Sequence, residues 1–357
     1  MEILKLTCRV ITPMFMAGAD NKTPELRPSE FKGMMRFWWR AIRADDNIEN
    51  LIKDETEIFG GSGEEQGKSK IMIKIYPQPN KENIGENIEP EISNYIGIKY
   101  LFYSTFSLKT KGEKIIRKYI KPDFQFNIEL SAYEKESFKK ALASLWTAIY
   151  LGGFGTRARR GAGNLEIVEA KGNLYELSFR LYDTSKTELK NRLKGNLDKI
   201  FEIVGCKSSI ALYPNLKNSK IIILDPEDSW QKALNKIGNI FNKFRENNKS
   251  DIFNMGAFGM PIMHNRFIIR IVPYEKTSRK NGFERISERM ASSLMIKLIK
   301  VEKNYFPVII KLSTKLPFAG KERKVKNEWE RERVEKINFA KIEEFLNNIK
   351  NKEEICL

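Results

Sequence analysis

One stretch near the middle of the chain constrains the fold more than any other: residues 152–163, which read GGFGTRARRGAG. It holds five glycines, three arginines and no acidic residue. Apolar residues at helical spacing precede it over 138–149. Gly152 and Gly153 are expected to end that helix, because glycine readily adopts the left-handed conformation. Apolar residues at 165–168 predict a short strand, so the stretch is predicted to be a loop between a helix and a strand.

The chemistry of this Gly/Arg loop (residues 152–163) favours a polyanionic ligand. Exposed backbone N–H groups can meet phosphate oxygens, and each arginine offers a planar fork of donors. The alternative is a tight turn with solvated arginines. The loop is not a P-loop, since it lacks Gly-Lys-Ser/Thr, nor a dinucleotide fingerprint, which needs a strand before it and a helix after it. The candidate phosphate-binding residues are Gly153, Gly155, Arg157, Arg159, Arg160, Gly161 and Gly163.

The charge balance points to the same class of partner. The 357 residues include 63 Lys and Arg against 46 Asp and Glu, a net charge of +17, and nucleic acid is the commonest partner of so basic a protein. With 41% hydrophobic residues, the chain can bury a large core and is expected to form two domains.

Little in the sequence suggests export, a membrane span or a bound metal. There is no apolar run long enough to cross a membrane, and the first residues read as a strand, so no signal peptide is expected. The three cysteines, Cys8, Cys206 and Cys356, are far apart. They predict neither a disulfide framework nor a metal site, which fits a reducing cytoplasm. No cofactor is expected.

A second basic segment, residues 29–43, is predicted to be a helix capped by Ser29. Its arginines at positions 36, 40 and 43 share one face. The plain interpretation is a core helix with a solvated basic edge. For Arg36 and Arg40 we favour RNA contact, with Trp39 or Phe37 stacking on a base. The basic path along this segment is expected to comprise Arg27, Lys32, Arg36, Arg40 and Arg43.

The order of predicted elements indicates an α+β protein. Strands are expected at 4–10, 71–75, 98–108, 124–130 and 164–169, with helices at 29–43 and 134–151. This order matches a ferredoxin-like, RRM-like βαββαβ domain over residues 1–172. RNA-recognition folds of this layout contact single strands through the sheet face or the loops.

A second ferredoxin-like domain is predicted over residues 173–357. Its strands are expected at 177–181, 221–224, 267–272, 291–301 and 306–312, with helices at 186–204 and 229–247. A C-terminal helix is expected from Val325 onward. The internal repetition rests on pattern rather than on sequence identity.

Several segments resemble the RAMP superfamily of CRISPR proteins, and most closely the first-numbered RAMP subunit of the type III-B (Cmr) effector complex. They are TPMF at 12–15, GADN at 18–21, ELRP at 25–28, KGMMRFWWRA at 32–41, the glycine-rich loop at 153–163 and ERMASS at 288–293. The resemblance implies two ferredoxin-like domains in a multi-subunit ribonucleoprotein. It also implies a place near the 3′ end of the guide RNA and a role in engaging single-stranded target RNA.

The resemblance implies further that this subunit is not the nuclease. Relatives that cleave RNA usually rely on a histidine with Tyr or Lys, or on a loop aspartate. Here His264 is the only histidine, and Asp20 equally suits an Asx-type turn. The leading hypothesis is therefore a non-catalytic RNA-binding subunit. The alternatives are a metal-independent endoribonuclease using His264 or a tyrosine as base, and a capping subunit that binds only proteins.

Overall fold

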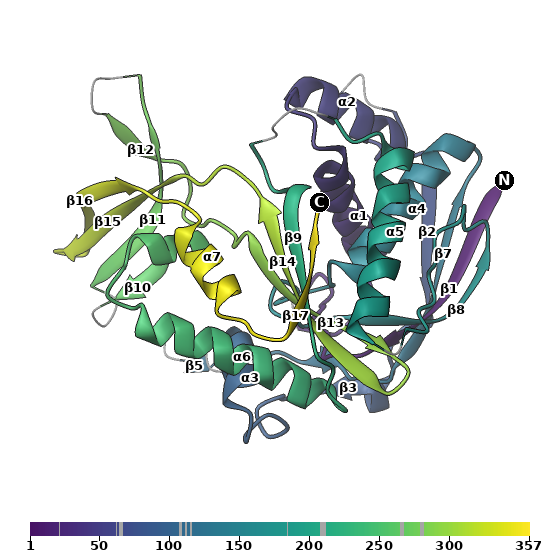
Figure 1. The fold of residues 1–357 in the computed structure, drawn as a ribbon, viewed down its shortest axis with the longest axis horizontal. Coiled ribbons are helices and arrows are strands. Elements are labelled where there is room, and N and C mark those ends of the chain that lie inside the picture. Colours follow the sequence, from purple (N-terminus) through teal and green to yellow (C-terminus); the bar gives the residue numbers. More distant parts are fainter. Residues whose placement is uncertain are drawn as a thin grey trace.

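Two four-stranded antiparallel sheets organise the structure, a computed structural model (Figure 1). It describes residues 1–357 apart from 21, 62, 64–66, 107, 108, 111, 112, 115, 184, 208–211, 265–267 and 279–281. The first sheet has the order β2-β7-β1-β8 and the second the order β13-β14-β9-β17. Their strands are β1 (Glu2–Val10), β2 (Ile71–Tyr76), β7 (Gln125–Ala132) and β8 (Leu165–Gly172), then β9 (Asn215–Leu224), β13 (Leu294–Val301), β14 (Asn304–Ser313) and β17 (Lys352–Cys356).

Both sheets follow one topology. Along the chain each is built as strand, helix, two strands, helix and strand, and across the sheet the strands lie in the order second, third, first, fourth. The helices are α1 (Pro28–Arg43) and α4 (Lys135–Tyr150) for the first sheet, and α6 (Trp230–Asn247) and α7 (Ala340–Asn347) for the second. The expectation of an α+β protein is confirmed.

The remaining elements are insertions between these strands and helices. Each sheet with its two helices is called a unit below. The longest helix among the insertions, α5 (Lys186–Val204), connects the two units. The others are α2 (Ile48–Phe59), α3 (Ile96–Phe102), η1 (Lys81–Asn83), η2 (Tyr103–Thr105), η3 (Asn254–Phe258) and the short strands β3 (Ile84–Gly85), β4 (Lys109–Thr110), β5 (Glu113–Lys114) and β6 (Tyr119–Ile120). A third sheet forms an arm from β10 (Ile262–His264), β11 (Ile269–Lys276), β12 (Phe283–Arg285), β15 (Phe318–Val325) and β16 (Glu328–Lys336).

The molecule is layered as sheet, helices, sheet, helices. One core packs the first sheet and the helices α1, α4 and α5 against one face of the second sheet. A second core packs the opposite face of that sheet against α3, α6 and α7. Alternate residues of β13 show the division, since Met295 and Ile299 join the first core while Ile296 joins the second. Because the first core draws on both sheets, the predicted division at residue 172 stays a prediction.

Three of the expected elements are wrong. The strand expected at 98–108 is helix α3 followed by η2, because Ile98, Leu101 and Phe102 are buried at helical spacing; residues 107 and 108 lie outside the described part. The helix expected from Val325 begins only at Ala340. The alternating charges before it belong to strand β16, where they pair across to β15.

The third wrong element is the strand expected at 177–181. Its backbone groups bind side chains of neighbouring helices instead of a strand. The N–H of Ser178 donates to Asn196 Oδ1 at 2.8 Å, and its carbonyl accepts from Trp146 Nε1 at 2.9 Å. The second unit therefore begins at β9. Of the strand expected at 267–272, residue 267 is not described, and β11 begins at Ile269.

Candidate nucleic-acid interface

The Gly/Arg loop folds back on itself directly after α4. The N–H of Phe154 donates to the carbonyl of Gly163 at 3.0 Å. Gly163 has a positive φ of 62°, and a Cβ there would lie 1.9 Å from the carbonyl oxygen of Phe154, so only glycine fits. Gly155 and Gly161 also have positive φ, whereas Gly152 and Gly153 do not. The expectation that this last pair ends the helix in a left-handed conformation is therefore wrong.

What Gly152 and Gly153 provide is room for close packing. A Cβ at Gly152 would lie 2.5 Å from both the Ala148 carbonyl oxygen and Trp38 Nε1, and one at Gly153 would lie 3.0 Å from the Ala162 carbonyl oxygen. A larger residue at Gly152 would thus push apart the end of α4 and helix α1.

The loop is also the joint between the two units, because it runs along the edge strand β13. The N–H of Ile296 donates to the carbonyl of Arg159 at 3.0 Å, and the N–H of Leu298 donates to Asn164 Oδ1 at 2.6 Å. The buried Lys297 donates its Nζ to the Gly152 carbonyl at 2.8 Å. Backbone pairing thus continues from the second sheet into the first unit.

Two of the three loop arginines hold this joint. Arg159 Nη1 donates to the Ser292 carbonyl at 2.6 Å, and its guanidinium lies over the ring of Phe37. Arg160 donates to the carbonyls of Leu294 and Phe258 at 3.1 and 3.2 Å. Burial lowers the pKa of both side chains, that of Arg160 to about 10. Their described partners are backbone carbonyls, so a phosphate would have to compete for donors already in use.

Arg157, the third arginine, is placed differently. It is a non-glycine residue at a φ of 68°, a conformation that L side chains rarely adopt. Its Nε donates to Ser104 Oγ at 2.6 Å, and its guanidinium carbon lies 4.3 Å from the centre of the Tyr103 ring. The side chain therefore points across the loop to η2, at the mouth of a cavity.

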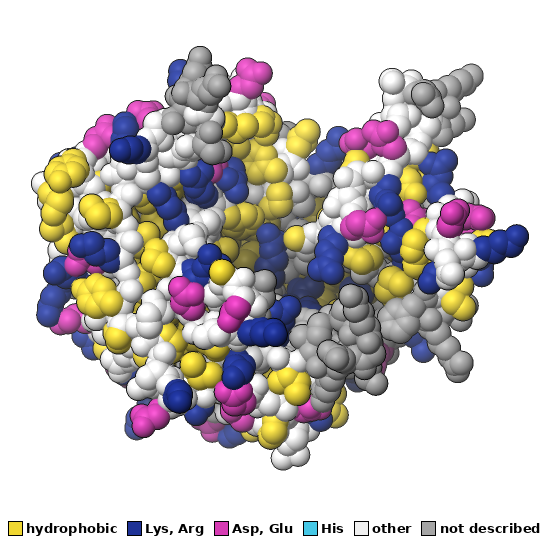
Figure 2. All heavy atoms as spheres, turned by 180° about the vertical axis from the view of Figure 1, so that it is seen from behind, with side chains coloured by type: hydrophobic (Ala, Val, Ile, Leu, Met, Phe, Trp, Pro, Cys, Tyr) yellow, Lys and Arg dark blue, Asp and Glu magenta, His cyan; other side chains and the backbone are white. Residues whose placement is uncertain are grey.

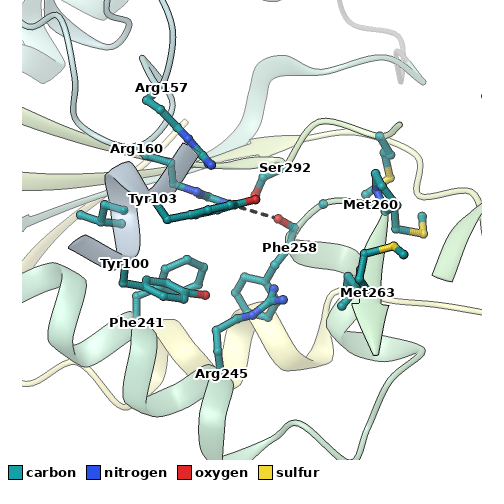
Figure 3. Close-up of a pocket in the computed structure, with 15 residues that line it drawn as sticks. Tyr100, Tyr103, Arg157, Arg160, Phe241, Arg245, Phe258, Met260, Met263 and Ser292 are labelled. Carbon is teal, nitrogen blue, oxygen red and sulfur yellow. Dashed lines mark hydrogen bonds between the residues drawn. The ribbon is translucent and has the colours of Figure 1, made fainter. Parts of the chain in front are cut away.

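The cavity measures about 910 Å³ and lies between the Gly/Arg loop, α3 with η2, α6, and the start of the arm (Figure 3). Three guanidiniums line it, from Arg157, Arg160 and Arg245, and none of its described lining residues is acidic. Its aromatic lining includes Tyr100 of α3 and Tyr103 of η2, together with Phe241 and Phe258. Viewed from behind, the molecule is hollowed, with Lys and Arg side chains around the hollow (Figure 2). A concave site with surplus positive charge and exposed rings suits a single-stranded nucleic acid.

Helices α3 and α6 carry much of this lining, and they cross at two glycines. A Cβ at Gly97 would lie 2.3 Å from the Asn235 carbonyl oxygen, and one at Gly238 would lie 2.4 Å from the Gly97 carbonyl oxygen. The side chain of Asn235 also accepts from the N–H of Gly97 at 2.9 Å. This close crossing brings Tyr100 and Arg245 to the same cavity.

The basic helix α1 differs from its expected role. Trp39 is only 1% exposed, so the prediction that its indole stacks on a base is wrong. Arg36 and Arg40 both pair with the buried Glu55 of α2, at 2.9 and 2.5 Å. Arg43 donates to Asp54 at 2.9 Å and to the Gly205 carbonyl at 2.7 Å. These arginines therefore connect α1 to helix α2 and to the C-terminal end of α5.

The start of α1 is also corrected. Arg27 is the N-cap residue and Pro28 the first residue of the helix, so the expected cap at Ser29 is wrong. Arg27 and Lys32 are both partly exposed, and burial lowers the pKa of Lys32. The structure brings neither of them into the cavity lining.

The open face of the first sheet carries an exposed ring, Tyr76, at the end of edge strand β2, but none on the central strands β1 and β7. On this face the central strands present Lys5, Thr7, Asn127 and Glu129, and none of these is aromatic. Lys5 lies 3.5 Å from Glu129, and Thr7 Oγ1 donates to Asn127 at 3.1 Å. Of the two surfaces expected for such a fold, the loop side is the better candidate.

Asp20 and His264, the two residues named as candidates for catalysis, lie outside the cavity lining. Asp20 accepts from the N–H groups of Lys22 and Thr23, both at 2.9 Å, so its carboxylate closes an Asx-type turn; residue 21 of the GADN segment is not described. His264 lies on β10, where Nε2 is buried with no hydrogen-bond partner among the described residues. Burial, with the charge of Arg245, lowers its pKa. Within the described residues, no three His, Cys, Asp or Glu side chains are grouped to hold a metal ion.

Similarity to known proteins identifies the family. Residues 7–166 match the RAMP superfamily. The CRISPR system Cmr subunit Cmr1-2 of Pyrococcus furiosus is 37% identical over 175 residues, an alignment that covers 44% of this chain and 90% of that protein. The chain belongs to the Cmr1 family of RAMP proteins. Subunit Cmr1-1 of the same organism is 30% identical over 230 residues, covering 62% of this chain and 65% of that protein. The resemblance stated from the motifs is confirmed.

Two solved structures share this fold. The crystal structure of apo Cmr1 from Pyrococcus furiosus matches with a TM-score of 0.68 and 22% identity, covering 99% of this chain and 98% of that one. A chain in the cryo-EM structure of the type III-B Cmr-beta complex bound to cognate target RNA matches with a TM-score of 0.60 and 15% identity, covering 97% and 98%. None of the helices described here is long and apolar enough to cross a membrane.

Proposed function

We propose that this chain is a non-catalytic RNA-binding subunit of a type III-B CRISPR (Cmr) ribonucleoprotein, contacting the guide RNA near its 3′ end, the single-stranded target RNA, or both. The observation that carries the proposal is the cavity at the joint of the two units. It combines three guanidiniums and two tyrosines, and none of its described lining residues is acidic. Family membership supports a place for this chain in such a complex, since the Cmr1 relatives are Cmr subunits and a similar fold occurs in a complex bound to target RNA.

The proposal includes two ferredoxin-like units in one cytoplasmic protein. Its support is the shared strand order of the two main sheets, each with two helices between its strands. The arm and the segment 81–121 are then insertions that carry parts of the cavity wall. Other subunits of the complex are the expected protein partners.

The test is a salt titration of the purified chain with a labelled single-stranded RNA in EDTA. Each neutralised phosphate of a single strand contributes about −0.7 to the slope of log affinity against log salt. Contacts from Arg157 and Arg245 alone therefore predict a slope of about −1.4 or steeper. No binding at all would contradict RNA binding by the isolated chain, and binding that does not respond to salt would contradict phosphate contacts by these arginines.

Running the products of the same titration on a denaturing gel tests the enzyme alternative. That alternative expects metal-independent cleavage that disappears in His264→Ala. The proposal expects intact RNA with both proteins, because the single histidine of the chain, His264, is partly buried and outside the cavity lining. The protein-only alternative expects no RNA binding, but stable assembly of the chain with the other subunits.

A further inference from the structure

The cavity has two chemically different sides. On one side lie the guanidiniums of Arg157 and Arg160 with the Tyr103 ring, and on the other lie the thioethers of Met260 and Met263 (Figure 3). Phosphate contacts alone need donors and positive charge, and would gain nothing from an apolar wall. Thioethers and rings instead suit a flat aromatic group, because polarisable sulfur packs well against ring edges.

A flat stacking surface, formed by the Tyr103 ring and the Arg157 guanidinium, lies at the opening of this cavity. Tyr103 is 49% exposed, and the Arg157 guanidinium stacks on its ring at 4.3 Å. Proteins that bind single-stranded RNA hold unstacked bases on aromatic rings and on guanidinium planes of this kind. The left-handed backbone at Arg157 is what directs this side chain toward η2.

Among the residues that the structure describes, no carboxylate pairs with the three guanidiniums of the cavity. The guanidiniums of Arg157, Arg159 and Arg245 contribute, after burial, to lowering the pKa of Arg160. Among the described residues, Arg245 has no carboxylate or carbonyl partner, although it lies over the ring of Phe258 at 5.6 Å. An anion entering beside these groups would relieve their mutual repulsion. A phosphate is such an anion, and its attached base would face the apolar wall.

We infer that the cavity is a nucleobase pocket: it takes one unstacked base of a single-stranded RNA against Tyr103 and the methionine wall, while a flanking phosphate lies at Arg157 and Arg245. The inference rests on the RNA binding proposed above. The volume of about 910 Å³ falls within the range of roughly 300–1,000 Å³ typical of small-ligand pockets. It leaves room for a single nucleotide but not for a duplex, whose bases are paired and stacked.

The test compares two strands of equal length and charge: a single-stranded RNA and a fully abasic ribose-phosphate strand. Affinities are measured at one salt concentration for the wild-type chain, Tyr103→Leu and the conservative variant Tyr103→Phe. The wild type and Tyr103→Phe should prefer the base-bearing strand by about tenfold, the size of one base–aromatic stack. Tyr103→Leu should lose that preference while keeping its affinity for the abasic strand.

The possible outcomes distinguish RNA binding itself from the nucleobase pocket. Salt-sensitive binding of both strands with equal affinity would leave RNA binding standing and overturn the nucleobase pocket. A base preference that survives unchanged in Tyr103→Leu would also overturn it, because the base would then stack elsewhere. No salt-sensitive binding of either strand would refute both the proposed function and the pocket. Crosslinking of a 5-iodouridine-labelled RNA provides an independent check, since the pocket predicts adducts on residues 100–103.

Discussion

Lys297 offers the sharpest test of the joint between the two units. Its side chain is 1% exposed, and its described acceptor is the Gly152 carbonyl at 2.8 Å. Burial lowers its pKa from 10.5 to about 7. A depressed lysine pKa means that, between pH 7 and 10.5, the unfolded chain binds a proton that the folded chain does not. The contribution of Lys297 to the free energy of unfolding therefore rises with pH across that window.

The magnitude follows from the size of the shift. A difference of 3.5 pKa units corresponds to roughly 5 kcal/mol between the two protonation states. Between pH 7 and 8.5 the free energy of unfolding should rise by roughly 1–2 kcal/mol on account of Lys297 alone. Replacing it in Lys297→Met removes the buried charge and one hydrogen bond. The variant should be more stable than the wild type at pH 7 by roughly 2–3 kcal/mol.

The assay is urea denaturation of the wild type and Lys297→Met at pH 7.0, 7.75 and 8.5. The difference between the two proteins should shrink as the pH rises, and comparing them cancels the titration of other groups. Lys300→Met on the same strand is the control, because Lys300 pairs with Glu166 at 3.0 Å. It should keep the wild-type pH dependence. If Lys297→Met is destabilised and follows the wild-type pH curve, the reasoning is refuted.

Two further predictions concern the packing that positions the cavity. In Gly97→Ala a Cβ would lie 2.3 Å from a backbone oxygen of α6, so the free energy of unfolding should fall by roughly 1–3 kcal/mol. The control is Gly195→Ala on the exposed side of α5, where an added Cβ would have no atom within 4 Å. This control should gain a few tenths to about 1 kcal/mol. Glu55→Gln should lose roughly 1–2 kcal/mol in urea denaturation because it removes the negative charge that pairs with both Arg36 and Arg40. The exposed Glu57→Gln should change stability by less than about 0.5 kcal/mol.

The elements predicted best from the sequence are helices with clear periodicity and caps. The segment 186–204 is helix α5 with the same bounds, and 229–247 is helix α6 with Ser229 as its N-cap. The loop at 152–163 was also predicted to follow a helix and precede a strand, as it does. In each case the signal lies within about twenty residues of the chain, where local spacing suffices.

The partners of side chains could not be predicted in the same way. Arg159 and Arg160 bind carbonyls more than 90 residues later in the chain, and no local pattern indicates those acceptors. For Trp39 a signal did exist, because it lies four residues after Met35 and three before Ile42, on the apolar side of α1. Here α1 lies between both sheets. Arg245 and Tyr103 enter the cavity only through the crossing of α3 and α6.

We expect the arginines of the Gly/Arg loop to divide their roles, with Arg157 binding RNA and Arg160 holding the units together. The most direct measurement pairs RNA affinity with unfolding free energy for Arg157→Gly and Arg160→Met. Arg157→Gly should weaken RNA binding by about tenfold and make the salt slope shallower by about 0.7. Its stability should change by less than about 1 kcal/mol, because glycine relieves the left-handed backbone. Arg160→Met should instead lose roughly 1–3 kcal/mol of stability. Wild-type RNA affinity in Arg157→Gly, or a large loss of its stability, would contradict this division.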